Sequence, residues 1–413
     1  MKVVKNSIIY LGGTILNKAI PFLLLPILTA HLATDEFGIM SIYLMMISFF
    51  SAFIGMAIHT NVAKNFFKYA KEQLSIMIGN IILVLLSTTI FYFLISLVLS
   101  FCYTELFSVP SIWVLIIPII SFMQMITSIN LTILRNEGKA MLYGVFEIVN
   151  TLINIGVALI VLLYFDMGWI SRPIGIISAF SIFGIFSILY MNKNGYIRLK
   201  YNRDETKKIL NLSVPLIPHV VGAIIIGLSD RFFIEEMISI EMVGIYSVGY
   251  MFGQVVMIFT EAFIMAWSPW FYKMLSEPSE SKKRIIVKYS YLYIVGVFAI
   301  AILISVFAKL IIPYFVDEQY HGSVEYVFWI AIGYAIHGVY KIFFPYIVHV
   351  SKTAFLGIST MVAAILNLIF NYFLIAKYGA IGAAYATAIA FLVSAILVIW
   401  YQNKHYKMPW LKL

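Results

Sequence analysis

Apolar runs long enough to cross a membrane recur along the whole chain, and only short polar breaks separate them. A helix needs about 20 apolar residues to cross about 30 Å of hydrocarbon, because each residue adds about 1.5 Å. The first run contains Lys18 and lacks a small-residue cleavage site, so we interpret it as a retained span and not as a signal peptide. The pattern predicts an all-α integral membrane protein with twelve spans: 8–32, 39–60, 76–102, 111–134, 141–165, 171–191, 209–232, 242–266, 287–313, 324–349, 354–376 and 381–402.

The composition agrees with this class of protein and excludes several kinds of chemistry. Hydrophobic residues make up 62% of the chain and charged residues 11%, and the mean hydropathy is +0.97, which lies outside the range of soluble proteins. The single cysteine, Cys102, excludes an intrachain disulfide, and the seven histidines show no metal-ligand spacing. No nucleotide-binding P-loop motif is present. We therefore expect no metal, no cofactor and no ATPase in the chain itself.

The distribution of Lys and Arg indicates the orientation. With the N-terminus inside, 22 of the 28 basic residues fall in cytoplasmic segments and four at the outer side. Basic loops resist translocation, so we expect both termini in the cytoplasm. The formal charge of +9 is mostly this topology signal, since the sequence shows no soluble basic face for nucleic acid. Membrane lipids are the expected partners of the basic loops.

Two halves of the chain resemble each other. The hydrophilic stretch 192–208 separates residues 1–191 from 209–413, and we interpret it as a cytoplasmic linker and hinge. Aligning Gly38 with Gly244 places "DEFGIMSIY" on "EMVGIYSVG". Each half has six spans, an even number, so the two copies have the same orientation. Such parallel repeats are a known transporter plan, and they predict two six-helix bundles around a central cavity.

A dense cluster of charges follows the seventh span, in the stretch 229–250. Its position at the end of an apolar run indicates the outer edge of the membrane, where we expect water to solvate it. Asp230 and Arg231 lie at the very end of the predicted helix. They are either part of an ordinary solvated turn or a pair that gates or lines an outward opening.

Each half also carries one lysine deep inside a span. In the first span Asn17 and Lys18 belong to a polar stripe at helical spacing, and in the tenth span Tyr334, His337 and Lys341 share one face. An ionised side chain in hydrocarbon costs about 2.5–3.5 kcal/mol on insertion scales, so such residues usually face protein or a water-filled cavity. We expect Asn17, Lys18, His337 and Lys341 to line the central cavity.

Four other polar residues within spans are candidates for the same region. Asn154 and Asn367 occupy equivalent positions in the fifth and eleventh spans, where asparagine either bonds between helices or lines the cavity. Glu147 and Glu261 lie in the fifth and eighth spans. Each is either a partner of a deep lysine or a site for a coupling proton or sodium ion.

Four phrases of the sequence resemble a known family. They are "HLATDEFGIMSIY" at 31–43, "LRNEGKAMLYG" at 134–144, "SDRFFI" with "VGIYSVGY" within 229–250, and "YGAIGAAYATAIA" at 378–390. Together they are similar to the polysaccharide-biosynthesis flippases, a group that includes the O-antigen and capsule repeat-unit flippases of the multidrug, oligosaccharidyl-lipid and polysaccharide exporter superfamily. The resemblance runs over the whole chain and respects the order of the phrases.

The resemblance implies a flippase in the bacterial cytoplasmic (inner) membrane. Its cargo would be an oligosaccharide on undecaprenyl pyrophosphate, moved from the cytoplasmic to the outer leaflet by alternating access, with a glycan polymerase as a partner. The cavity cations of the family correspond here only to Lys18 and Lys341. Relatives that flip peptidoglycan precursor have additional C-terminal spans, which argues against that cargo.

Two other functions remain open on the sequence. An ion-coupled drug or metabolite exporter of the same superfamily would use Glu147 and Glu261 as cation sites. A membrane-embedded glycan polymerase or glycosyltransferase would carry a large outer loop, whereas every predicted outer loop is short. We therefore expect a transporter and not an enzyme.

The predicted orientation is tested by fusions to alkaline phosphatase, which is active only outside the cytoplasm. A fusion after Asp317 should be active, and a fusion to the C-terminus should be inactive, because an even number of spans returns the chain to the cytoplasm. The reverse pair of activities would contradict the orientation.

Overall fold

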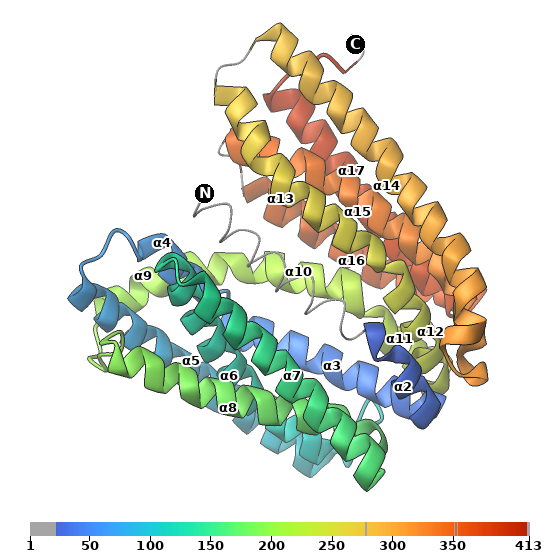
Figure 1. The fold of residues 1–413 in the computed structure, drawn as a ribbon, viewed down its shortest axis with the longest axis horizontal. Helices are drawn as coiled ribbons and strands as arrows, with labels where there is room; N and C mark the ends of the chain where they lie inside the picture. The colour runs from blue at the N-terminus through green and yellow to red at the C-terminus, as the bar shows by residue number, and fades with distance from the viewer. Residues whose placement is uncertain (1–21, 277–278, 351, 353, 411–413) are drawn as a thin grey trace. The chain divides into compact units, whose positions relative to one another are not determined.

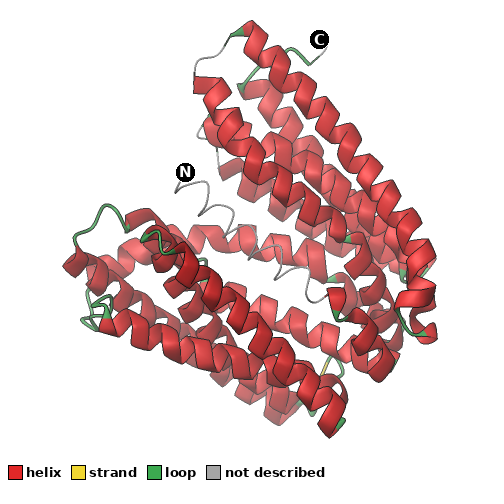
Figure 2. Ribbon diagram, in the orientation of Figure 1, coloured by secondary structure: helices red, strands yellow, loops and turns green. Residues whose placement is uncertain are grey.

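The computed structural model describes residues 22–276, 279–350, 352 and 354–410, and these are mostly helical (Figures 1 and 2). Short 3-10 turns lie at Gly168–Ile170 (η1), Val214–Leu216 (η2) and Glu318–Ser323 (η3), and one small antiparallel hairpin pairs β1 (Glu105–Leu106) with β2 (Val109–Pro110). The α-helices are α2 (Leu25–His31), α3 (Thr34–Gly55), α4 (His59–Asn65), α5 (Lys71–Cys102), α6 (Ser111–Asn136), α7 (Ala140–Phe165), α8 (Ser171–Lys193), α9 (Arg203–Ser213), α10 (Ile217–Leu228), α11 (Asp230–Met237), α12 (Ile240–Gly253), α13 (Val255–Ser276), α14 (Glu280–Phe315), α15 (Val324–His349), α16 (Ala354–Tyr378) and α17 (Ile381–His405).

The prediction of an all-α membrane-spanning fold is confirmed. In the described part of the chain, eleven helical stretches are long and apolar enough to cross a membrane. They coincide with the last eleven predicted spans. The predicted first span, 8–32, lies mostly outside the described residues, which include its final helix α2.

The described helices form two compact units. The first comprises residues 39–221, and the second comprises 22–38 together with 222–413. The boundary near residue 221 lies inside α10, shortly after Pro215 and Pro218. The sequence-based division assigns 22–38 to the N-terminal bundle, whereas in the structure these residues pack with the C-terminal unit.

Hydrogen bonds to η3 and to the residue before it explain this placement of 22–38. The buried Tyr320 hydroxyl in η3 lies 2.8 and 2.9 Å from the carbonyl oxygens of Leu32 and Ala33. The backbone N–H of Asp317 donates to the Thr29 hydroxyl at 3.4 Å. The Leu32 carbonyl lies just beyond the end of α2, and the Tyr320 hydroxyl gives it a partner. The Ala33 carbonyl also accepts the Phe37 N–H of α3 at 3.0 Å.

The repeated glycines mark a close crossing of α3 and α12 in the second unit. A β-carbon on Gly244 would overlap the carbonyl oxygen of Thr34, and one on Gly38 would overlap that of Ile240. Thr34 precedes Gly38 by four residues, and Ile240 precedes Gly244 by four, so the crossing is nearly symmetric. Small residues permit backbones to approach closely where helices cross in a membrane. This contact explains why both copies of the repeat keep a glycine.

The linker 192–208 is not a free tether. The backbone of Arg198 passes so close to α5 that a β-carbon on Gly79 would overlap its carbonyl oxygen. The buried Asn80 side chain then binds the linker: its amide donates to the Lys200 carbonyl at 2.9 Å, and its oxygen accepts from the Asn202 N–H at 2.8 Å. The expected hinge is therefore held against the first unit, and the unit boundary follows it in α10.

We expect Gly244→Ala to destabilise the protein, because the added methyl group meets backbone and not a movable side chain. Overpacking of this kind costs about 1–3 kcal/mol. The melting temperature of the purified protein in detergent measures the effect. Gly296→Ala is the matched control, since nothing lies within 4 Å of a β-carbon there and alanine favours a helix. Equal melting temperatures for the two variants would contradict the crossing.

Candidate functional site

A buried ion pair lies at the junction of α10 and α11. Arg231 Nη1 lies 2.7 Å from Asp230 Oδ1, and the two side chains are 7% and 1% exposed. The backbone N–H of Arg231 donates to the same carboxylate oxygen at 3.0 Å, and the Tyr246 hydroxyl donates to the other oxygen. Such full hydrogen bonding is what makes a buried ion pair tolerable.

Three tyrosines surround this pair. The Arg231 guanidinium lies 4.1 Å from the centre of the Tyr250 ring, a cation–π contact. The Tyr250 hydroxyl bonds that of Tyr334 on α15 at 2.8 Å. Tyr246 and Tyr250 are one helical turn apart on α12, so both face the pair. The expectation that water solvates Asp230 and Arg231 is wrong, because rings from α12 and α15 cover a position that the apolar pattern marks only as a helix end.

Asn367 belongs to a buried polar cluster beside this pair. Its side-chain oxygen accepts from the Ser229 hydroxyl at 3.1 Å and from the Asn371 amide at 3.2 Å. Its own amide donates to the Thr387 hydroxyl on α17 at 3.4 Å. The contacts with Ser229 and Thr387 are hydrogen bonds between segments, the first of the two roles expected for an asparagine here, whereas the contact with Asn371 lies within α16. A role of Asn367 in the cavity stays a prediction.

Lys341 and Glu261 form a pair of a different kind. The Lys341 Nζ lies 4.0 Å from Glu261 Oε1, and the side chains are 29% and 26% exposed. Lys341 is eight residues from the end of α15, about 12 Å at 1.5 Å per residue. One turn away, His337 lies between the rings of Tyr340 and Phe391, with ring centroids 5.4 and 4.6 Å away. This pair is long and partly open, whereas Asp230–Arg231 is short and closed.

In the first unit, Glu147 faces a polar pocket of about 340 Å³. Besides Glu147, the lining residues are His59, Gln124, Thr127, Ser128, Leu131, Thr132, Arg135, Tyr143 and Phe180. The Tyr143 hydroxyl donates to Glu147 Oε1 at 3.0 Å, while Oε2 is buried without a hydrogen-bond partner among the described residues. The Arg135 guanidinium supplies positive charge to this pocket.

The remaining predicted site residues do not join these groups. Asn154 on α7 accepts a hydrogen bond from Arg172 Nη1 on α8 at 2.7 Å, so its side-chain oxygen is held by the neighbouring helix. Asn17 and Lys18 lie outside the described residues, and their place in the cavity stays a prediction.

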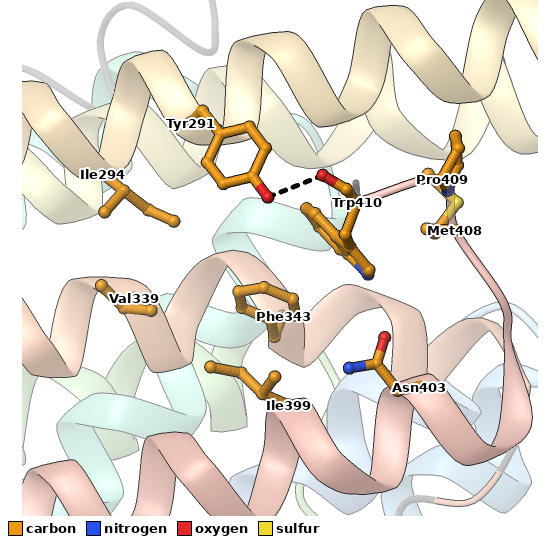
Figure 3. Close-up of a pocket in the computed structure, with 9 residues that line it drawn as sticks. All are labelled: Tyr291, Ile294, Val339, Phe343, Ile399, Asn403, Met408, Pro409 and Trp410. Carbon is orange, nitrogen blue, oxygen red and sulfur yellow. Dashed lines mark hydrogen bonds between the residues drawn. The ribbon is translucent and has the colours of Figure 1, made fainter. Parts of the chain in front are cut away.

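An apolar pocket of about 610 Å³ lies in the second unit between α14, α15, α17 and the C-terminal residues 408–410 (Figure 3). The Tyr291 hydroxyl, one of its few polar groups, donates to the Trp410 carbonyl at 2.9 Å. The Trp410 ring packs 5.0 Å from that of Phe343. With so few polar groups left for a ligand, this pocket does not suit a sugar or a phosphate.

Sequence reasoning missed the tyrosines around Arg231 and most of the polar pocket. The tyrosines resemble the many other aromatic residues of the chain, so no local signal distinguishes them. The pocket had a signal: Gln124, Ser128, Leu131 and Arg135 follow helical spacing along α6.

Comparisons with known proteins agree on a family and a fold. A family model described as "Polysaccharide biosynthesis protein" matches residues 3–275. The "Lsg locus putative protein 1" of Haemophilus influenzae is 23% identical over 374 residues, which cover 89% of this chain and 90% of that protein.

Two solved structures share the fold. An inward-facing multidrug resistance MATE family transporter of the MOP superfamily matches 97% of this chain and 94% of its own, with a TM-score of 0.71 and 12% identity. The lipid II flippase MurJ, in an inward closed conformation, matches 96% of this chain and 87% of its own, with a TM-score of 0.70 and 14% identity. The chain therefore has the fold that these two transporters share.

Asp230→Asn should destabilise the protein strongly, because it leaves the Arg231 guanidinium buried without its counter-charge. Breaking a buried pair in this way costs about 3–5 kcal/mol. The double variant Asp230→Asn/Arg231→Met should recover most of the melting temperature, since neither side chain is then charged. Glu236→Gln, a change at an exposed acid of α11, is the control. A single Asp230→Asn variant as stable as this control would contradict the structural role.

Proposed function

Because the chain belongs to the polysaccharide biosynthesis protein family, we propose that it is a flippase for undecaprenyl-pyrophosphate-linked oligosaccharide units. It moves them from the cytoplasmic to the outer leaflet of the bacterial inner membrane by alternating access, for O-antigen or capsule assembly. A glycan polymerase would use the product on the outer side.

The chemistry of this cargo defines what the protein must supply. A lipid pyrophosphate brings several negative charges and a bulky polar glycan into a region where isolated charges are costly. The protein must therefore offer fixed positive charge and polar groups inside its spans. These groups must also be accessible, since a cation that is fully enclosed by its own partners cannot bind cargo.

The single observation that carries the proposal is the Lys341–Glu261 pair. It combines a cation deep in a span with a separation of 4.0 Å and partial exposure of both side chains. A hydrogen-bonded ion pair is typically about 2.7–2.9 Å long, as Asp230–Arg231 is. The contact of Lys341 with Glu261 is therefore longer than a hydrogen-bonded ion pair, and we propose that a phosphate group of the cargo replaces the carboxylate beside this lysine.

Glu261 then has two roles in the proposal. Without cargo, its carboxylate offsets the charge of Lys341 and reduces the cost of a cation in the membrane. When a phosphate of the cargo binds Lys341, the Glu261 carboxylate becomes the group that accepts a coupling proton or sodium ion. Lys18 is proposed to supply the second cation, from the N-terminal half, with Asn17 and His337 as polar neighbours of the cargo.

A drug or metabolite exporter is the second candidate, and the unpaired Glu147 Oε2 favours it, because such a carboxylate suits a coupling cation. The two functions separate in cells. If the protein is the flippase, deletion of its gene should remove surface glycan and leave ethidium efflux unchanged. If it is the exporter, deletion should reduce ethidium efflux and leave surface glycan unchanged.

Lys341→Ala should abolish glycan display at normal protein levels, with lipid-linked units accumulating in the inner leaflet, because the cargo loses its cation. Lys341→Arg should retain part of the activity, since it keeps the charge with a different shape. Lys309→Ala is the control, as it removes an exposed lysine of α14. Surface glycan and membrane protein are measured in the same cells.

The alternative is that Lys341 serves only to neutralise Glu261. In that case Lys341→Met/Glu261→Met should restore the display that Lys341→Met loses. Full display by Lys341→Ala would remove this residue from the transport mechanism.

A further inference from the structure

A polar stripe leads into the first unit from the end of α6. Gln124, Thr127, Ser128, Leu131, Thr132 and Arg135 line the pocket from successive turns of this helix. Arg135 lies in the last turn, at the predicted cytoplasmic side, and Gln124 lies eleven residues deeper, about 16 Å at 1.5 Å per residue. All but Leu131 present groups that form hydrogen bonds. Such a lining is unusual where the surroundings are hydrocarbon, because each polar group needs a partner.

The rest of the lining comes from α7, from the start of α4 and from Phe180 on α8. Tyr143 and Glu147 are one turn apart on α7, which packs with α6 and α8 (Figure 1). His59 opens α4, and its Nδ1, like Glu147 Oε2, is buried without a hydrogen-bond partner among the described residues. Arg135 forms no ion pair within 4 Å in the described part of the chain. The lining of the pocket therefore has hydrogen-bonding capacity that the described residues leave unused.

Strained backbone holds His59 in this lining. Met56 and Ala57 have φ angles of +44° and +51°, a left-handed conformation that residues other than glycine rarely adopt. They end α3 and let α4 start in a new direction at His59. Strain of this kind costs about 1–3 kcal/mol per residue and persists mainly at functional sites.

We propose that this pocket binds the pyrophosphate and first sugar of the lipid-linked cargo on its cytoplasmic side, before translocation. Arg135 donates to the phosphate oxygens, and the hydroxyl groups, Gln124 and Glu147 bind the sugar. The inference rests on the proposed flippase function and names a loading site distinct from Lys341.

The chemistry of the lining favours this ligand over the others. Arginine presents a planar fork of N–H donors that matches two phosphate oxygens. Hydroxyl and amide groups suit a sugar, and a carboxylate accepts hydrogen bonds from sugar hydroxyls. An apolar drug would leave most of these groups without partners, and a small cation would be repelled by Arg135. The volume of about 340 Å³ is at the lower end for ligand pockets, which suits one sugar with its phosphate and excludes the whole oligosaccharide.

The test measures binding of farnesyl pyrophosphate to the purified full-length protein by calorimetry, with farnesol as the probe that lacks phosphate. Arg135→Gln should weaken binding of farnesyl pyrophosphate about tenfold or more, because a charge-assisted hydrogen bond is lost. Farnesol binding should not change. The affinity of the Arg135→Lys variant for farnesyl pyrophosphate should lie between the affinities of the wild type and of Arg135→Gln. Because this variant keeps the charge, an intermediate affinity shows that the loss does not come from a folding defect. Lys64→Gln, which removes an exposed cation of α4 outside the pocket, should bind as the wild type does.

The proposed binding of the sugar is tested separately, by measuring glycan display in cells. Gln124→Leu should reduce glycan display and should weaken farnesyl pyrophosphate binding less than Arg135→Gln does, since the proposal assigns Gln124 to the sugar. The Ser51 hydroxyl, which donates to Gln124 at 2.8 Å, also loses a partner in this variant. Equal binding of farnesyl pyrophosphate by Arg135→Gln and the wild type would overturn the loading site, as would wild-type binding that farnesol matches. Neither result would affect the flippase function, which Lys341 and the gene deletion test separately.

Discussion

The structure of this protein depends on one constraint: inside a membrane, a polar group needs a partner from the protein or from water, because hydrocarbon supplies none. The described spans meet this constraint in two ways. The Asp230 carboxylate is bonded by Arg231 and by the Tyr246 hydroxyl, and the group ties α10, α11, α12 and α15 together. Lys341 and Glu261 lie 4.0 Å apart, and both side chains are partly exposed. The first arrangement stabilises a bundle, and the second leaves capacity for a ligand.

The same distinction applies to the repeated asparagines. Asn154 and Asn367 are equivalent in the two halves, yet they have different partners: Arg172 holds the first, and a neutral cluster of Ser229, Asn371 and Thr387 holds the second. In both units the asparagine bonds to a neighbouring helix. The repeat thus conserves the use of an asparagine as a link between helices, while each half has changed the residue that it binds.

The repeated glycines are subject to a steric constraint. Gly38 and Gly244 each meet a backbone carbonyl of the other helix, so neither accepts a side chain. This crossing, with Tyr320 on the Leu32 and Ala33 carbonyls, brings the start of α3 into the second unit, although the rest of α3 belongs to the first. The helix α3 is thus divided between the two units, with residues 34–38 in the second and 39–55 in the first.

The sequence by itself determined the class of protein, eleven spans to within about ten residues at their ends, the repeat and the place of Lys341 within its span, because hydropathy and helical spacing are local properties. The structure alone decided how polar groups are satisfied. Water was expected at Asp230 and Arg231, but Tyr246, Tyr250 and Tyr334, which follow 15 to 104 residues later in the chain, cover them. Likewise, hydrogen bonds of Asn80 hold the linker 192–208 against α5. Arg135, which the sequence places among ordinary cytoplasmic residues, lines a pocket together with His59 and Glu147. Each outcome depends on side chains from distant segments, and a local pattern carries no information about which segments meet.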